Sequence, residues 1–202
     1  MKKSLTGFLP LFLLIIFAFT GINDPLPIGS AIPNADAKLK DVTGKEVSLR
    51  GSLKPNGLLV MFSCNTCPVV KKYQSRTLEA AKDATSRQIG VILLNSNEAY
   101  RDKGDGFADM QAYAKQQGYD FSYVLDQNSA MADLFGALRT PEVFLFDGKG
   151  LLVYHGAIDD NSNAAGDVTR KHLALAMQEL VSGKEISTRV TRSVGCSIKR
   201  PE

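Results

Sequence analysis

Apolar runs of strand length alternate with segments of helical period through the middle of the chain. Residues 57–62 read GLLVMF and residues 89–94 read IGVILL, and both runs are typical of strands covered on both faces. Between them, residues 68–88 space their apolar positions along one side of a helix. This order predicts a βαβ unit with a right-handed crossover.

Further strands and helices are expected on either side of that unit. They are a hairpin over 39–49, a helix over 107–117, a strand over 121–125, a helix over 129–135 with Met131, Leu134 and Phe135 inward, a hairpin of 143–146 with 151–158, and a helix capped by Asp167 and ended by Gly183. The hairpins make the sheet mixed. The predicted class is α/β, with a central mixed β-sheet flanked by helices and an N-terminal β-hairpin extension.

The N-terminal pattern predicts export. Lys2 and Lys3 precede the apolar run LFLLIIFAF at 11–19, which is the pattern of a signal peptide over residues 1–22. Nine apolar residues are too short to cross about 30 Å of hydrocarbon, although an uncleaved segment serving as a membrane anchor is the alternative. We therefore expect an exported protein, in the periplasm or cell envelope if the source is bacterial.

Composition places the rest of the chain among globular proteins. The 202 residues are 44% apolar, 22% charged and 8% aromatic, which is enough to bury a core. Residues 23–36 carry three prolines and predict a linker, 37–183 form one domain, and 184–202 form a mostly polar tail. Without Lys2 and Lys3, the formal charge falls from +3 to +1, so a nucleic-acid partner is not expected.

Two cysteines carry the candidate chemistry. Cys64 and Cys67 bracket Asn65 and Thr66 at the point where a buried strand gives way to a helix. Cysteine attacks as a thiolate, and the unpaired N–H groups of a helix N-terminus stabilise that anion. We therefore expect Cys64 to attack and Cys67, one turn inside the helix and more shielded, to resolve the product through a Cys64–Cys67 couple.

The alternatives for this pair are a metal site and an inert disulfide. Zinc needs two more ligands, and the remaining candidates, Cys196, His155 and His172, lack paired spacing. A bridge across so short a loop constrains the unfolded chain only weakly, so stability alone is a poor reason for it. Redox chemistry is favoured, with no metal and no cofactor expected. With three cysteines in all, the chain is no disulfide scaffold.

Four motifs in order resemble a known family. They are CNTCP at 64–68, RTPEVFLFD at 139–147, GAIDD at 156–160 and GCSIK at 195–199. Together with the strand and helix order, they resemble the thioredoxin-fold proteins, and among them the peroxiredoxin-like (redoxin) branch. The resemblance covers roughly residues 36–181 and implies a thioredoxin-like fold.

The resemblance also implies a substrate-binding edge. In this family, the proline at the position of Pro141 is cis and faces the dithiol, and the backbone at Thr140 pairs with an extended substrate segment. A trans proline that merely opens the next strand is the alternative. The GCSIK surroundings suggest that Cys196 is a second resolving cysteine, the alternative being a spare thiol.

The sequence departs from the proteins it resembles at several places. Ser63 stands where thioredoxins proper have tryptophan, and the proton relay for Cys67 is unassigned. Peroxiredoxins bind peroxide through Pro-x-x-x-Thr/Ser-x-x-Cys, but Gly57 and Met61 occupy those two positions before Cys64.

The residues favour a thiol–disulfide oxidoreductase, an enzyme acting on protein or small-molecule disulfides with an unknown electron donor. A peroxiredoxin-like thiol peroxidase with an antioxidant role is one alternative, and a non-catalytic redox-sensing or binding module is another.

Overall fold

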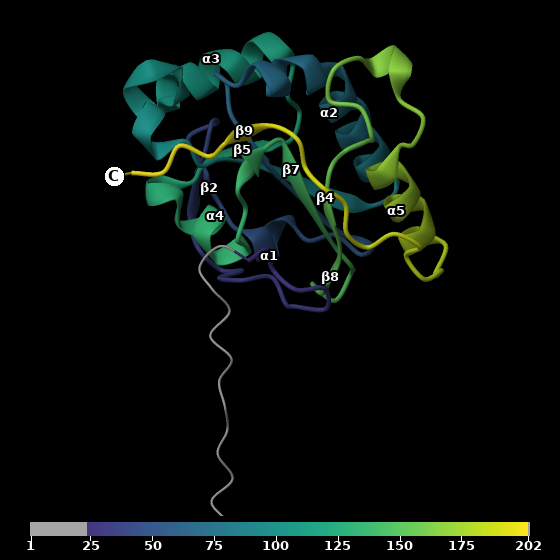
Figure 1. Cartoon of the computed structure of the whole chain (residues 1–202). Helices are drawn as coiled ribbons and strands as arrows, with labels where there is room; N and C mark the ends of the chain where they lie inside the picture. Colours follow the sequence, from purple (N-terminus) through teal and green to yellow (C-terminus); the bar gives the residue numbers. More distant parts are fainter. Residues whose placement is uncertain (1–23, 202) are drawn as a thin grey trace, which may run out of the picture.

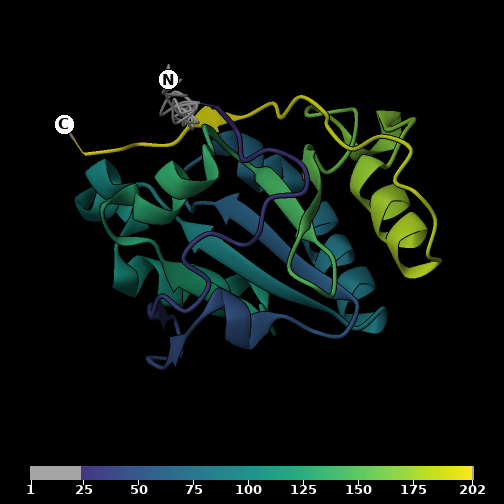
Figure 2. The ribbon, with the colours of Figure 1, turned by 90° about the horizontal axis from the view of Figure 1, so that it is seen from below.

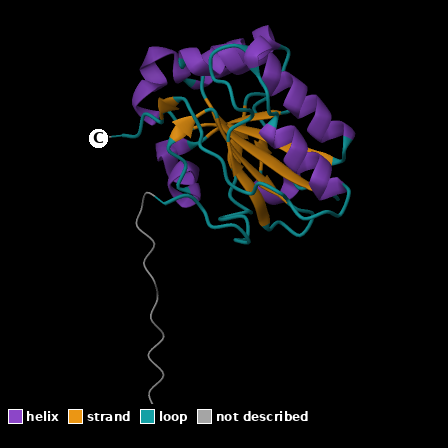
Figure 3. Cartoon of the chain, turned by 45° about the vertical axis from the view of Figure 1, so that its right-hand side comes forward, coloured by secondary structure: helices purple, strands orange, loops and turns teal. Residues whose placement is uncertain are grey.

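The computed structural model describes residues 24–201, and the predicted signal or anchor over 1–22 lies outside them. Seven strands form one mixed sheet in the order β2-β1-β5-β4-β3-β7-β8. Figure 3 shows the strands in orange among the purple helices. Their bounds are β1 Leu39–Asp41, β2 Glu46–Val47, β3 Gly57–Ser63, β4 Ile89–Asn95, β5 Ser122–Leu125, β7 Glu142–Phe146 and β8 Leu152–Gly156. A separate pair joins β6 (Arg139–Thr140) to β9 (Cys196–Ser197).

The centre of the sheet is the predicted βαβ unit. Strands β3 and β4 run parallel from the Gly57–Ile89 pair to the Ser63–Asn95 pair, and helix α2 (Pro68–Ser86) connects them. Every residue of both strands is buried, as the unbroken apolar runs predicted. Both hairpins are antiparallel, so the expectation of a mixed sheet is confirmed.

Helices cover both faces of the sheet. Helices α2, α3 (Phe107–Gln117) and α5 (His172–Val181) pack with Leu59 and Met61 of β3 in one core. Helices α1 (Leu49–Ser52) and α4 (Ala130–Phe135) pack with Leu58, Val60 and Phe62 in the other. Successive residues of β3 thus supply opposite cores, because side chains alternate across a strand. Single helical turns lie at Glu98–Tyr100, Arg101–Asp105, Gln127–Ser129 and Ala165–Asp167.

Two details of the predicted helices are wrong. Helix α5 begins at His172, because residues 165–167 form only a separate turn, so Asp167 is not its cap. Leu134 is 47% exposed, while Met131 and Phe135 are buried as predicted. Helix α4 begins where the Asp126 carboxylate accepts hydrogen bonds from the N–H groups of Met131 and Ala132.

The segments before and after the main elements lie against the fold. Residues 24–36, within the predicted linker, contain neither helix nor named strand, yet the N–H of Leu26 bonds the Phe135 carbonyl. Gly136, which ends α4 at φ +60°, faces this segment so closely that a Cβ would overlap the Asp24 carbonyl oxygen and come 2.6 Å from its carbon. Lead-in and fold are therefore packed together.

The C-terminal tail crosses the molecule instead of projecting from it. Figure 1 shows this yellow segment returning from α5 past the ends of the strands, and Figure 2 shows β9 within it. Two backbone hydrogen bonds hold the tail against β8. The His155 N–H donates to the Arg189 carbonyl, and the Thr191 N–H donates to the His155 carbonyl. Within residues 24–201 no helix combines the length and apolar character that crossing a membrane requires.

Candidate active site

The two cysteines of CNTCP lie where the sequence places them. Strand β3 ends at Ser63, Cys67 is the N-cap position of α2, and Pro68 opens the helix. Proline suits the first position of a helix because the N–H it lacks would have no partner there. The first cysteine is 0% exposed and the second 4% exposed, so Cys64 is the more shielded of the two, opposite to our expectation.

The disulfide in the structure joins Cys67 to Cys196, with 6.1 Å between their Cα atoms. The expected Cys64–Cys67 bond is therefore not the one present, and Cys64 carries a thiol. The sequence could not show this pairing, because 129 residues separate its two cysteines. GCSIK, the motif singled out in the tail, was the only signal pointing to it.

Burial and hydrogen bonding act against each other on the Cys64 thiol. Burial raises its pKa above the usual value, and the negative charge of Asp105 raises the pKa further. A hydrogen bond with Thr140 and the N–H groups of Thr66 and Cys67 lower it. The sulfur lies 3.4 Å from Thr140 Oγ1. The N–H groups expected at the helix start are present, but in this closed arrangement burial outweighs them.

A buried carboxylate holds the CNTCP turn in place. One oxygen of Asp105 accepts bonds from the N–H of Asn65 at 2.7 Å and from Asn95 Nδ2 at 2.8 Å. The other accepts from Thr66 Oγ1 at 2.7 Å and Asn97 Nδ2 at 3.0 Å. Sequence reasoning missed this residue, because nothing around position 105 distinguishes a buried acid from a surface one.

Thr140 lies beside both cysteines, next to the cis proline that the resemblance implied. The Thr140–Pro141 peptide bond is cis, and both residues are buried. The Cys67 sulfur lies 3.5 Å from the Thr140 carbonyl oxygen. The backbone edge at Thr140 is paired with the chain's own tail, with Thr140 opposite Cys196 and Arg139 opposite Ser197.

Other polar groups lie outside this centre. In the described part of the chain, no group of three or more His, Cys, Asp or Glu side chains could hold a metal ion. His155 stacks on Phe144, and its Nδ1 atom is buried without a partner. Burial lowers the pKa of His155.

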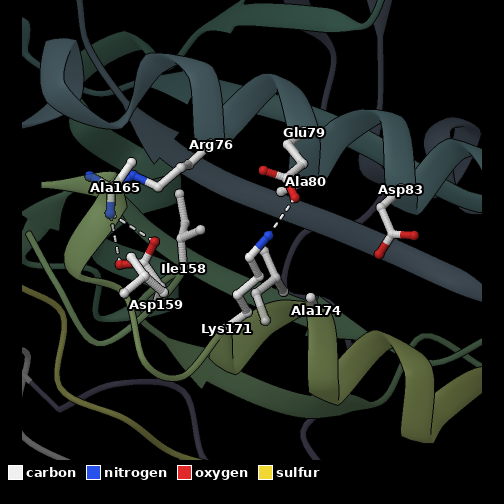
Figure 4. A pocket seen from close by; sticks show the side chains of 11 residues that line it. Arg76, Glu79, Ala80, Asp83, Ile158, Asp159, Ala165, Lys171 and Ala174 are labelled. Carbon is white, nitrogen blue, oxygen red and sulfur yellow. Dashed lines mark hydrogen bonds and ion pairs between the residues drawn. The ribbon is translucent and has the colours of Figure 1, made fainter.

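Figure 4 shows a separate pocket between α2 and α5. Its wall includes a buried ion pair in which Arg76 Nη1 lies 2.8 Å from Asp159 Oδ2, while Lys171 and Glu79 pair at its exposed edge. Among the described residues, no cysteine lines it. We therefore assign this pocket no part in the chemistry.

Comparisons with known proteins give a family match and two similar solved structures. The profile of the AhpC/TSA family matches residues 28–155. An uncharacterized conserved protein from Geobacillus kaustophilus is 30% identical, with a TM-score of 0.80, over 87% of this chain and 93% of that one. A hypothetical protein from Sinorhizobium meliloti is 31% identical, with a TM-score of 0.80, over 88% of this chain and 97% of that one.

A more distant structure supports the fold alone. The thioredoxin domain of a thiol-disulfide oxidoreductase from Bacteroides vulgatus is 20% identical, with a TM-score of 0.53, over 64% of this chain and 88% of that one. It confirms the thioredoxin-like fold that the motifs implied. No curated protein sequence matches the chain.

Proposed function

Because this chain belongs to the AhpC/TSA family, we propose that it is an oxidoreductase that exchanges thiols and disulfides at a centre of three cysteines, Cys64, Cys67 and Cys196. One observation carries the proposal. A disulfide and a free thiol lie together at the start of a helix, against Thr140 and a cis-proline. A bond with a structural role alone would not need the third sulfur beside it.

The proposed reaction begins from the fully reduced centre. The Cys64 thiolate attacks a substrate disulfide, forming a mixed disulfide and releasing one substrate thiolate. Cys67 then attacks the Cys64 sulfur, which forms the Cys64–Cys67 bond and releases the second substrate thiolate. Each step exchanges one disulfide for another, so no prosthetic group is needed.

Cys196 completes the sequence. Its thiolate attacks Cys67, forming the Cys67–Cys196 bond of the structure and returning Cys64 to the thiol state. The net result is one reduced substrate disulfide and one oxidised pair in the protein. An external dithiol must then reduce Cys67–Cys196 before the next cycle.

A thiol peroxidase is the second candidate, and the isolated Cys64 thiol beside the Thr140 hydroxyl is what favours it. Peroxide would oxidise Cys64 to a sulfenic acid and leave as water, and Cys67 would then form the disulfide and release a second water. Both routes begin with the Cys64 thiolate, so the raised pKa of Cys64 does not separate them. Gly57 and Met61, which stand where peroxiredoxins have the proline and the threonine or serine of their peroxide pocket, count against the peroxidase.

Three matched cysteine-to-serine variants test the proposal. With dithiothreitol as the donor and insulin as the substrate, Cys64→Ser and Cys67→Ser should lose turnover. Cys196→Ser, reduced and freed of dithiothreitol before insulin is added, should complete a single turnover and accumulate the Cys64–Cys67 bond. Equal rates for all variants and for a blank without protein would refute catalysis and favour the redox-sensing or binding alternative. Hydrogen peroxide consumption by the same set tests the peroxidase.

Two further parts of the proposal concern partners and location. We propose extended protein disulfides as substrates, because the Thr140 edge pairs with a strand in this structure. Export through residues 1–22 follows from the sequence pattern alone. Sequencing the N-terminus of the protein recovered from cells would distinguish a cleaved signal from a retained anchor.

A further inference from the structure

The tail occupies the backbone edge where a substrate strand would pair. Cys196 lies opposite Thr140 and Ser197 opposite Arg139 in an antiparallel pair, and the Ile198 N–H bonds the Leu138 carbonyl at 3.0 Å. We propose that residues 195–198 are an internal copy of the substrate. The enzyme then prefers extended polypeptide disulfides in which glycine precedes the reactive cysteine and an apolar residue lies two positions after it. This inference rests on the proposed function.

The position before the cysteine leaves no room for a side chain. A Cβ on Gly195 would overlap the Thr140 carbonyl oxygen, come within 2.7 Å of its carbon and lie 3.2 Å from the Pro141 nitrogen. All three atoms belong to the backbone at the cis-proline, which cannot turn aside as a long side chain can. A strand in this register is therefore selected for glycine.

The two positions after the cysteine differ in what they require. Ser197 is exposed, whereas Ile198 is 6% exposed and packs in the core that includes Phe62, Phe135 and Phe144. This alternation follows from the strand, whose successive side chains point to opposite faces. The first position after the cysteine should accept most residues, and the second should require an apolar one.

The tail also prevents any other strand from entering. Beyond Ile198, the N–H of Lys199 bonds Asn97 Oδ1 at 2.9 Å, and Arg200 pairs with Asp133 at 2.7 Å. With the tail seated, Cys64 is fully buried, so no external disulfide can reach it. Once Cys67–Cys196 is reduced, the tethered tail competes with substrate only through its effective concentration, which is on the order of millimolar for a flexible tether.

Peptides test the preference directly. The probes are synthetic copies of residues 192–201 whose cysteine carries thionitrobenzoate. The protein is the double variant Cys67→Ser with Cys196→Ser, which retains Cys64 as its only cysteine. Attack by Cys64 forms the mixed disulfide and releases coloured thionitrobenzoate. Replacing the glycine by alanine or the isoleucine by aspartate should slow release about tenfold or more, the effect of losing about 1.4 kcal/mol. Replacing the serine by alanine is the matched control and should leave the rate within about twofold.

The same preference can be tested in the intact tail. In the chain with Cys64 alone, Gly195→Ala should unseat the tail and speed alkylation of Cys64 by N-ethylmaleimide about tenfold, a change of about 1.4 kcal/mol in tail docking. Ser197→Ala should leave that rate unchanged. If Gly195→Ala fails to fold, the peptide series still decides.

The outcomes separate this inference from the proposed function. Equal rates for all peptides, together with insulin turnover by the natural chain, would overturn the substrate preference and leave thiol–disulfide exchange standing. No reaction with any peptide and no insulin turnover would overturn both. Slower reaction of only the alanine and aspartate peptides would support the inference.

Discussion

Asp105→Asn should destabilise the protein while making its reactive thiol more acidic. The substitution preserves the shape of the side chain but replaces a carboxylate that accepts four hydrogen bonds. An amide has one oxygen acceptor and one NH2 donor group, so only one side of the network can remain as it is. The backbone N–H of Asn65 cannot adapt, so we expect the new amide oxygen on that side.

The cost then falls mainly on the side of Thr66 and Asn97. The hydroxyl of Thr66 can turn to accept a bond, but Asn97 cannot flip without losing the bond that its oxygen accepts from the Lys199 N–H. The bond from Asn97 Nδ2 to the charged carboxylate is lost, and this buried N–H donor then faces the NH2 donor of the new amide. We expect a loss of about 2–4 kcal/mol in the free energy of unfolding. That is a large share of the stability of an ordinary domain.

Urea denaturation of the oxidised protein measures this loss. The matched control is Asp109→Asn, whose carboxylate accepts an exposed bond from the Gly106 N–H, and we expect it to change stability by less than about 0.5 kcal/mol. In the chain with Cys64 alone, Asp105→Asn should also lower the pH at which alkylation becomes fast, because the Asp105 charge raises the pKa of Cys64. Stability within about 0.5 kcal/mol of the parent and an unchanged alkylation profile would refute this reasoning.

Three further substitutions test the fold. Gly136→Ala should lower the free energy of unfolding in urea by at least about 2 kcal/mol, because its Cβ would overlap the Asp24 backbone. Gly118→Ala, at a similar φ but with open space around it, should lower it by about 1 kcal/mol. Equal losses would contradict this prediction. Arg76→Met should lower the free energy of unfolding by about 3–5 kcal/mol, because it leaves the buried Asp159 carboxylate without its ion-pair partner. Lys171→Met, which breaks only an exposed pair with Glu79, should lower it by less than about 1 kcal/mol. Burial lowers the pKa of His155 below its usual 6.5, so the unfolded chain binds the proton more tightly than the folded chain does. The free energy of unfolding should therefore fall as the pH drops below 6.5, by at most about 1.4 kcal/mol per pH unit. His155→Phe should remove that slope, and a slope that persists would assign it to another group.

The local order of the chain was readable because single segments determine it. The unbroken apolar runs predicted β3 and β4. The helix predicted over 107–117 ends where expected, because Gly118 takes up the left-handed conformation there. The position of Cys64 and Cys67 followed from the junction of β3 with α2. Thr140 and Pro141 came only from the resemblance, since nothing in their own composition indicates a cis bond.

The features that the sequence did not predict depend on contacts between residues far apart in the chain. Cys196 is brought to Cys67 by the path of the tail, which a local pattern cannot predict. Asp105 acquires its role only when the fold brings Asn65, Thr66, Asn95 and Asn97 around its carboxylate. Leu134 satisfied the helical period yet faces outward, because α4 is too short for its period to define one face.

The most direct test of the three-cysteine centre is a disulfide map of the oxidised protein. The protein is quenched in acid, labelled with a thiol reagent, digested without reduction and analysed by mass spectrometry. We expect a peptide pair joined through Cys67 and Cys196, with the label on Cys64. A bond between Cys64 and Cys67 with the label on Cys196 would show that the tail cysteine lies outside the resting redox couple, and the three-cysteine centre would then be wrong.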